Sequence, residues 1–284
     1  MRINHNISSM IGQGALGTQQ AALKKSLEKL STGLRINRAS DDAAGLSVSE
    51  SLRSKVRGMG RAKSNAEDGI ALLQIAEGAT GEVNNILQRL RELAIQSSTD
   101  TMTTTERAFI DKEFGQLMNE ITRISNSASY NGMTLLDGAA GSFGVSGGSA
   151  SVLHIGSGSS SSVDRLSITV GAMTLGSLGL SSTTTSVSTS SGALAALSAI
   201  DGAVRSVNTV RSDLGAYVNR LEFAISNLGN QIYNTQDAES RIRDVDFAKE
   251  TTEFTRAQIL TQSATSMLAQ ANQVPQGVLS LLQK

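Results

Sequence analysis

The sequence predicts a mainly α-helical fold: a long antiparallel coiled-coil or helical rod with paired N- and C-terminal helices and a small β-hairpin region in the middle of the chain. Three observations predict it. Apolar residues recur at steps of three and four near both chain ends, which is the spacing of a coiled-coil seam. The sequence contains one proline, a residue that costs about 3 kcal/mol inside a helix. Residues 137–192 have few charges and are rich in Gly, Ser and Thr.

The longest periodic runs of apolar residues lie in the C-terminal part of the chain. From 197 to 232, steps of three and four reach apolar side chains with one exception, Arg211. A helix over this range would be about 50 Å long at 1.5 Å per residue. A second run from 260 to 281 predicts another helix, which Pro275 is expected to kink or break.

The N-terminal half predicts further helices with the same spacing, in runs over 16–34, 46–95 and 110–128. Two capping-box patterns indicate where helices begin, since a Ser or Thr three residues before a Glu satisfies two free backbone N–H groups. These are Ser47 with Glu50 and Thr103 with Glu106. We therefore expect helices to begin one residue after Ser47 and one residue after Thr103.

The central segment predicts turns and short strands. Tyr130-Asn131-Gly132 and Asp137-Gly138 are typical turn sequences. The β-branched runs 151–155 and 165–170 predict two strands. Residues 181–191 offer little to bury and are expected to be exposed and mobile. Residues 156–163 and 181–191 are therefore both expected to tolerate deletion.

Composition excludes several classes of function. Lys and Arg balance Asp and Glu at 25 each, which argues against a general nucleic-acid or anionic-membrane binder. There is no cysteine and only two histidines, which excludes thiolate chemistry and a multi-histidine metal site. No segment reaches the roughly 18 apolar residues of a membrane span, and the N-terminus does not resemble a cleavable secretory signal. We expect no catalytic residue, cofactor or metal, and no enzyme.

Three motifs have alternative interpretations. Residues 12–17 match the G-x-G-x-x-G fingerprint, but no strand precedes them, so packing glycines are favoured over a dinucleotide site. Residues 144–148 match G-x-S-x-G without the strand–turn–helix context of a nucleophile elbow, so a Gly/Ser loop is favoured. Asp41 and Asp42 could bind a cation, but a helix N-terminal feature is the favoured interpretation.

Several long segments at both ends of the chain carry a family resemblance. They are SLEKLSTGLRINRASDDAAGLSVSESLRS (26–54), NAEDGIALLQIAEGA (65–79), LQRLRELAIQSS (87–98), RISNSASYNGMTLLDG (123–138), AESRIRDVDFAKE (238–250) and RAQILTQSATSMLAQANQVPQGVLSLL (256–282). Through these segments the chain resembles bacterial flagellin, the subunit of the flagellar filament. Residues 139–192 match nothing particular.

The resemblance implies a domain organisation. Residues 1–43 and 243–284 would form a terminal coiled-coil domain. Residues 44–136 and 193–242 would form a helical rod domain, to which the Gly/Ser/Thr-rich insert 137–192 would belong. The outer domains of longer flagellins would be missing.

The resemblance also implies assembly and partners. The chain would polymerise with itself, bind a flagellin export chaperone at its C-terminal segment, and meet filament cap and hook-junction proteins. It would leave the cell through the flagellar export apparatus, and the filament could be extracellular or periplasmic. The positions expected to form the polymerisation seam are Leu23, Leu27, Leu30, Leu34, Leu260, Met267, Val274, Val278 and Leu281.

One binding site can be carried over from flagellins that the Toll-like receptor for flagellin detects. Their Arg–Leu–Glu cluster corresponds here to Arg89, Leu93 and Glu113. Arg89 and Leu93 are four residues apart and are expected to share an exposed helix face. The same face could instead pack against the next subunit of the filament. Two other classes of function stay open: a hook–filament junction protein, and a filament-borne enzyme.

Overall fold

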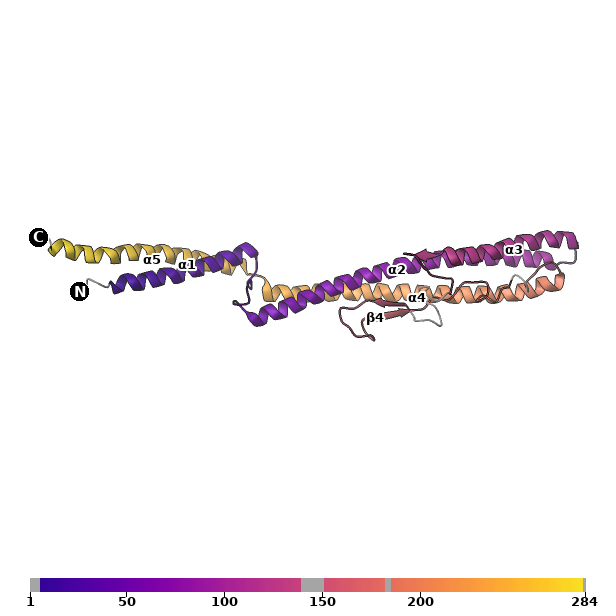
Figure 1. The fold of residues 1–284 in the computed structure, drawn as a ribbon, viewed down its shortest axis with the longest axis horizontal. Helices are drawn as coiled ribbons and strands as arrows, with labels where there is room; N and C mark the ends of the chain where they lie inside the picture. Colours follow the sequence, from indigo (N-terminus) through magenta and orange to yellow (C-terminus); the bar gives the residue numbers. More distant parts are fainter. Residues whose placement is uncertain (1–5, 139–150, 182–184, 283–284) are drawn as a thin grey trace. The chain divides into compact units, whose positions relative to one another are not determined.

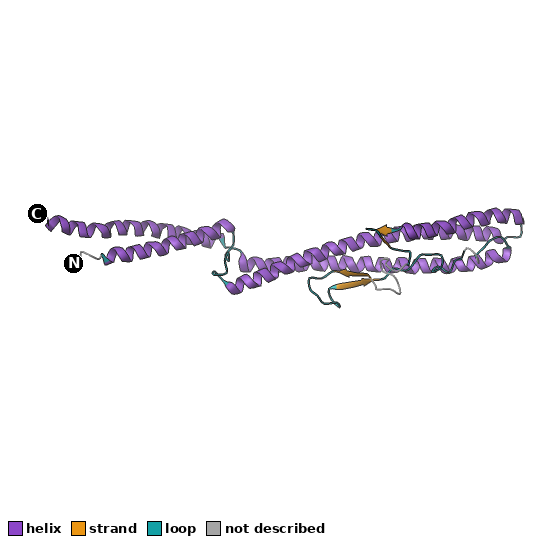
Figure 2. Cartoon of the chain, viewed as in Figure 1, coloured by secondary structure: helices purple, strands orange, loops and turns teal. Residues whose placement is uncertain are grey.

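The structure is a computed structural model that describes residues 6–138, 151–181 and 185–282, with side chains described as far as residue 273. Its elements in chain order are α1 (Ile7–Thr32), α2 (Ala43–Ser98), α3 (Thr104–Ser127), β1 (Ser129–Tyr130), β2 (Met133–Thr134), β3 (Ser151–His154), β4 (Arg165–Ile168), α4 (Ser190–Arg243) and α5 (Phe247–Leu282). Long helices dominate, and the strands form small antiparallel pairs (Figure 2). The predicted fold class is confirmed.

The chain divides into two compact units. Residues 1–55 and 233–284 form the first, and residues 56–232 form the second. Helices α2 and α4 each contribute residues to both units. The sequence-based domain boundaries, after 43 and before 243, therefore lie inside the first unit.

In the first unit, α1 packs antiparallel against α5 (Figure 1). Asn6 Nδ2 donates to the carbonyl of Ala271 at 2.9 Å, and Lys29 Nζ lies 3.3 Å from Glu250 Oε2. The two contacts join opposite ends of the helices. Helix α5 continues past residue 275 to Leu282, so of the kink or break expected at Pro275 the break is wrong.

In the second unit, α2, α3 and α4 run alongside one another (Figure 1) and enclose a continuous apolar core. The α4 side of this core follows the predicted helical period, with buried residues Ala193, Ala196, Ile200, Ala203, Val207, Leu214 and Leu221, and Leu228 continues the period in a separate small cluster with Met59 and Ala62. Because the period is regular, one face of α4 stays buried along the length of the unit.

The helix starts follow the sequence in one case and not in the other. Thr103 caps α3, with its side chain accepting from the N–H of Glu106 and the carboxylate of Glu106 accepting from the N–H of Thr103, as predicted. Helix α2 instead begins at Ala43, because Asp42 Oδ1 accepts from the N–H of Gly45 at 2.9 Å. Ser47 therefore lies inside the helix, and the favoured interpretation of Asp42 as a helix N-terminal residue fits the observed bond.

The central segment is less exposed than expected. Strands β3 and β4 pair antiparallel, with Ser151 opposite Ile168. β4 and the residues after it pack into the core of the second unit through Leu166, Ile168, Val170, Met173, Leu178 and Leu180. The expectation that 181–191 is exposed is wrong for Thr185 and Val187, which are buried, whereas Ser188, Thr189 and Ser191 are exposed and 182–184 lie outside the described residues. The G-x-S-x-G match at 144–148 lies outside the described residues.

Candidate interaction surfaces

An exposed ion-pair cluster joins α2 to α3. Arg89 Nε and Nη2 donate to Glu113 Oε1 at 3.1 and 2.9 Å, and Nη1 donates to Glu92 Oε2 at 3.1 Å. The hydrogen bonds to Glu113, followed by those to Glu92, raise the pKa of Arg89 above its ordinary value. The guanidinium therefore keeps its charge on a surface where half of its side chain is exposed.

Leu93 does not share this surface. Its side chain is 1% exposed and belongs to the apolar core of the second unit. The expectation of one exposed face with Arg89 and Leu93 is therefore wrong. The structure brings Arg89 and Glu113 together and puts Leu93 beneath them as a packing residue.

Phe109, which the sequence reading did not single out, is exposed one helical turn before Glu113 on α3. Lys112 Nζ lies 5.9 Å from the centre of its ring, within the range of a cation–π contact. The sequence contained a signal for this exposure. The apolar period of α3 runs through Ile110 and Phe114, and Phe109 is out of step with it. Phe109 therefore presents an exposed aromatic ring one helical turn from Glu113.

The contact between α1 and α5 uses small and polar side chains as well as leucines. On α1, Ser26 is buried, and Leu16, Gln19, Leu23 and Leu30 are half-buried. On α5, Ala257 is buried and Thr261, Ala264 and Leu268 are half-buried. A Cβ added at Gly12 would lie 3.4 Å from Leu268 Cδ1, in ordinary contact. Gly12 therefore lies inside helix α1 and faces α5. A dinucleotide-binding glycine would instead follow a strand and precede a helix, so the G-x-G-x-x-G match does not fit.

The expected seam residues divide into two groups. Leu23, Leu30 and Leu34 are half-buried. Leu27, Leu260 and Met267 are exposed in the single chain, so their expected place in the polymerisation seam stays a prediction, and they lie outside the contact between α1 and α5. The reason is that the contact line on α1 passes through Ser26, one residue and about 100° away from Leu27. Val274, Val278 and Leu281 lie outside the described side chains.

Both terminal helices consequently present apolar side chains to solvent. We call these exposed residues the terminal apolar faces. They are Ile7, Met10, Ile11 and Leu27 on α1, and Phe247, Ile259, Leu260 and Met267 on α5. Several large apolar side chains exposed on the same pair of helices are typical of a surface that a partner covers.

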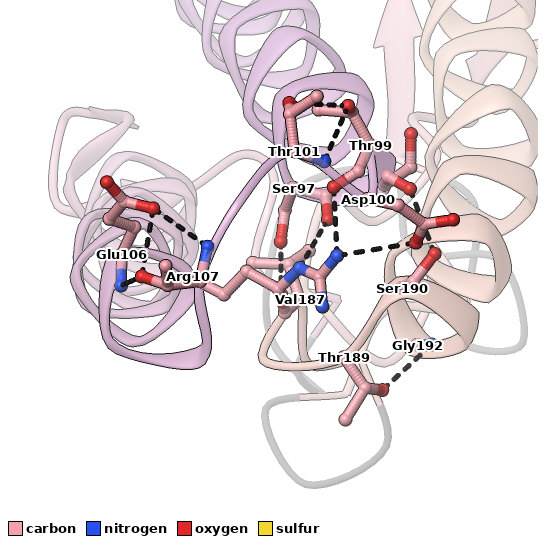
Figure 3. A network of polar contacts seen from close by, with 12 residues as sticks. Ser97, Thr99, Asp100, Thr101, Glu106, Arg107, Val187, Thr189, Ser190 and Gly192 are labelled. Atoms are coloured by element: carbon pink, nitrogen blue, oxygen red, sulfur yellow. Dashed lines mark hydrogen bonds and ion pairs between the residues drawn. The ribbon is translucent and has the colours of Figure 1, made fainter.

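A polar network fixes the turn between α2 and α3 (Figure 3). Arg107 Nε donates to the carbonyl of Ser97 at 3.0 Å, and Nη2 donates to the carbonyl of Thr99 at 2.8 Å. Ser190 Oγ donates to the carbonyl of Ser98 at 2.9 Å. The last carbonyls of α2 would otherwise lack donors, so the network caps this helix and ties it to the start of α4.

Residues 185–190, which we call the strap, are held by the same region. Asp111 Oδ1 accepts from Ser186 Oγ and from the N–H of Val187, both at 2.9 Å. Ser97 Oγ donates to the carbonyl of Val187. The strap is thus fastened to both α2 and α3, which explains why this Ser/Thr-rich sequence is partly buried.

The described residues hold no cluster of three or more His, Asp or Glu side chains that could bind a metal ion. Among the same residues, no helix has an apolar stretch long enough to cross a membrane. The groups brought together are ion pairs, caps and apolar faces, which are suited to packing and binding.

Comparison with known proteins gives consistent results for both ends of the chain. Residues 3–140 match the bacterial flagellin N-terminal helical region, and residues 197–282 match the bacterial flagellin C-terminal helical region. The chain is 44% identical to the flagellar filament 33 kDa core protein of Treponema phagedenis, over 99% of this chain and 100% of that protein. It is 45% identical to a flagellin of Halalkalibacterium halodurans, again over 99% and 100%.

Among solved structures, a putative flagellar hook-associated protein from Vibrio parahaemolyticus is similar with a TM-score of 0.58. The match covers 72% of this chain and 100% of that one at 16% sequence identity. At that identity the similarity concerns the fold alone.

Proposed function

The chain belongs to the bacterial flagellin family, and we propose that it is a structural subunit that polymerises into the flagellar filament for swimming motility. The observation that carries this proposal is the pair of terminal apolar faces, which the contact between α1 and α5 leaves uncovered. In a polymer, neighbouring copies would cover these faces, and burial of apolar area is the main favourable term in such association. Two relatives that match 99% of this chain are named a flagellar filament 33 kDa core protein and a flagellin.

Seeded growth tests the proposal directly. Purified chain is added to filament fragments, and electron microscopy records whether the filaments lengthen. The double substitution Leu260→Ser and Met267→Ser removes exposed apolar side chains of α5 and is expected to abolish growth. Gln262→Ser, at an exposed position on the same helix, is the matched control and is expected to leave growth unchanged. Normal growth of the double variant would contradict assembly through this face.

The alternative of a hook–filament junction protein gains no specific support, because the similar hook-associated structure shares only the fold. Counting copies per cell separates the two, since a filament subunit is abundant and a junction protein is not. A filament-borne enzyme has no identified site among the described residues. A positive result in a hydrolase screen would argue for it.

The remaining partners follow from family membership. We propose an export chaperone that holds the C-terminal segment, a cap complex at the filament tip, and passage through the flagellar export apparatus. The exposed apolar side chains of α5, such as Ile259 and Met267, support the chaperone proposal, since they would need cover before assembly.

A receptor surface is proposed at Arg89 and Glu113, with Leu93 supporting it from below. The exposed ion pair between α2 and α3 supports this proposal. The same surface could contact the next subunit in the filament, and both roles are compatible because a polymer covers what a monomer exposes.

A further inference from the structure

The exposed turn between β1 and β2 has the chemistry of a covalent modification site. It consists of Asn131 and Gly132, the one Asn-Gly pair in the sequence, and both residues are exposed. Their φ angles are +49° and +78°, so both are left-handed, as the type I′ turn of a two-residue hairpin requires. The pairing of Tyr130 with Met133 closes the turn.

We propose that Asn131 is a site of spontaneous deamidation through a cyclic imide formed with Gly132. The main-chain nitrogen of Gly132 attacks Cγ of Asn131, so that an N–Cγ bond forms and the Cγ–Nδ2 bond breaks. Nδ2 leaves as ammonia and takes up the proton lost by the Gly132 nitrogen. Water then opens the ring at one of its two carbonyls, which gives aspartate or isoaspartate. Solvent water is the only co-reactant.

Three features of the turn favour this reaction. Gly132 has no Cβ to hinder the approach of its nitrogen, and among the described residues no protein group accepts a hydrogen bond from that nitrogen. Ring closure requires Asn131 to leave the left-handed conformation that the turn imposes, so the hairpin must open first. Only two residue pairs hold the hairpin, and such short ladders open readily.

The surroundings of the turn determine what the modification does. The N–H of Leu135 donates to the carbonyl of Ala128 at 3.0 Å, and Ser125 Oγ donates to the carbonyl of Leu136 at 2.8 Å. Leu135 and Leu136 are buried, so both sides of the hairpin are anchored just beyond its tip. Isoaspartate adds one carbon to the main chain, and a two-residue turn between fixed anchors cannot absorb it without losing the pairing of Tyr130 with Met133.

The test uses the full chain, kept in neutral buffer and sampled over time. Trypsin releases residues 124–165 as one peptide, because no Lys or Arg lies between Arg123 and Arg165. That peptide also contains Asn126, which is followed by the small residue Ser127 inside α3 and serves as an internal control. Tandem mass spectrometry reports the amide at each position, and labelling by an isoaspartyl methyltransferase reports isoaspartate.

We expect Asn131 to lose its amide several-fold faster than Asn126, with isoaspartate appearing at position 131. Asn131→Gly keeps a Gly-Gly pair suited to the same turn and is expected to remove the methyltransferase label that arises at position 131, leaving only the label from Asn126 and from Asp137, which Gly138 follows. The proposal is overturned if Asn131 keeps its amide while a free peptide of the same sequence converts, or if Asn131 and Asn126 react at equal rates.

Discussion

Arg89 and Leu93 are four residues apart on α2, but one side chain reaches solvent and the other packs in the core. Leu93→Ala removes buried atoms and leaves a cavity, which is expected to lower the free energy of unfolding by about 2–5 kcal/mol. Arg89→Ala removes only exposed ion pairs and is expected to leave that free energy close to its original value. Chemical denaturation of the two monomers measures the difference. Equal stabilities would contradict the burial of Leu93.

The surface role of Arg89 can then be tested without interference from folding. Arg91 is a matched control, since it is also half-exposed on α2 and pairs with Asp201 at 2.9 Å. We expect Arg89→Ala to reduce receptor activation by monomers and swimming of the strain, while Arg91→Ala changes neither. If both variants behave alike in the two assays, a specific surface at Arg89 and Glu113 is ruled out.

The exposure of single residues was only partly predictable from spacing. Four residues advance about 400° around a helix, so Arg89 and Leu93 differ by about 40° in direction. Helix α2 packs against both α3 and α4, which widens its buried arc enough to include Leu93 but not Arg89. Spacing within one helix carries no information about how many neighbours that helix has.

The carboxylate of Asp111 holds the strap to α3. Asp111→Ala removes the acceptor of two hydrogen bonds and leaves the N–H of Val187 buried without a partner. We expect the free energy of unfolding to fall by about 1–3 kcal/mol. Faster hydrogen exchange of the Val187 amide is the local measurement. Asp201→Ala, at an exposed ion pair, is the control and should change neither value.

The loop before α2 gives a pH dependence. Asp41 accepts hydrogen bonds from Lys25 Nζ at 2.7 Å and from the N–H groups of Arg38 and Asn37. The Lys25 bond, followed by the backbone bonds, holds the pKa of Asp41 below its ordinary value. The unfolded chain therefore binds this proton more readily, and the stabilisation is lost as the pH falls through the folded pKa.

Comparing filaments of the chain with filaments of its Asp41→Asn variant measures this contribution, because α1, which carries Lys25, is expected to be fully ordered only after assembly. The difference in unfolding free energy between the two should be constant near neutral pH and shrink in acid, below the ordinary aspartate range. A difference that does not change with pH would show that Asp41 makes no charge-dependent contribution.

Element boundaries were predictable where local chemistry decides them. Thr103 caps α3 as its sequence pattern indicates, whereas at α2 the carboxylate of Asp42 precedes Ser47 and begins the helix earlier. The burial of the strap could not be predicted, because the hydroxyl of Ser186 and the N–H of Val187 are satisfied by Asp111, which is distant in sequence. Polar composition predicts exposure only when no such partner exists.

On the scale of the whole molecule, periodicity predicted the helices and the pairing of α1 with α5. It could not fix which face of each terminal helix meets the other, because apolar residues occur on more than one face. The contact line that includes Ser26 and Ala257 competes with the line that includes Leu27 and Leu260. Small residues allow close helix approach, and the larger side chains remain outside for another partner.

The terminal helices should therefore gain most of their order on assembly. In a single antiparallel helix pair, the outer apolar faces stay exposed to water. Its packing therefore buries little apolar area to offset the conformational entropy lost when the two helices become ordered. Limited trypsin digestion compares monomer with filament. Cleavage after Lys24, Lys249 and Arg256 is expected to be fast in the monomer and strongly reduced in the filament, where neighbouring copies cover α1 and α5. Cleavage after Lys63, in the packed second unit, should be slow in both. Equal resistance of the terminal sites in monomer and filament would mean that the chain ends are already folded before assembly.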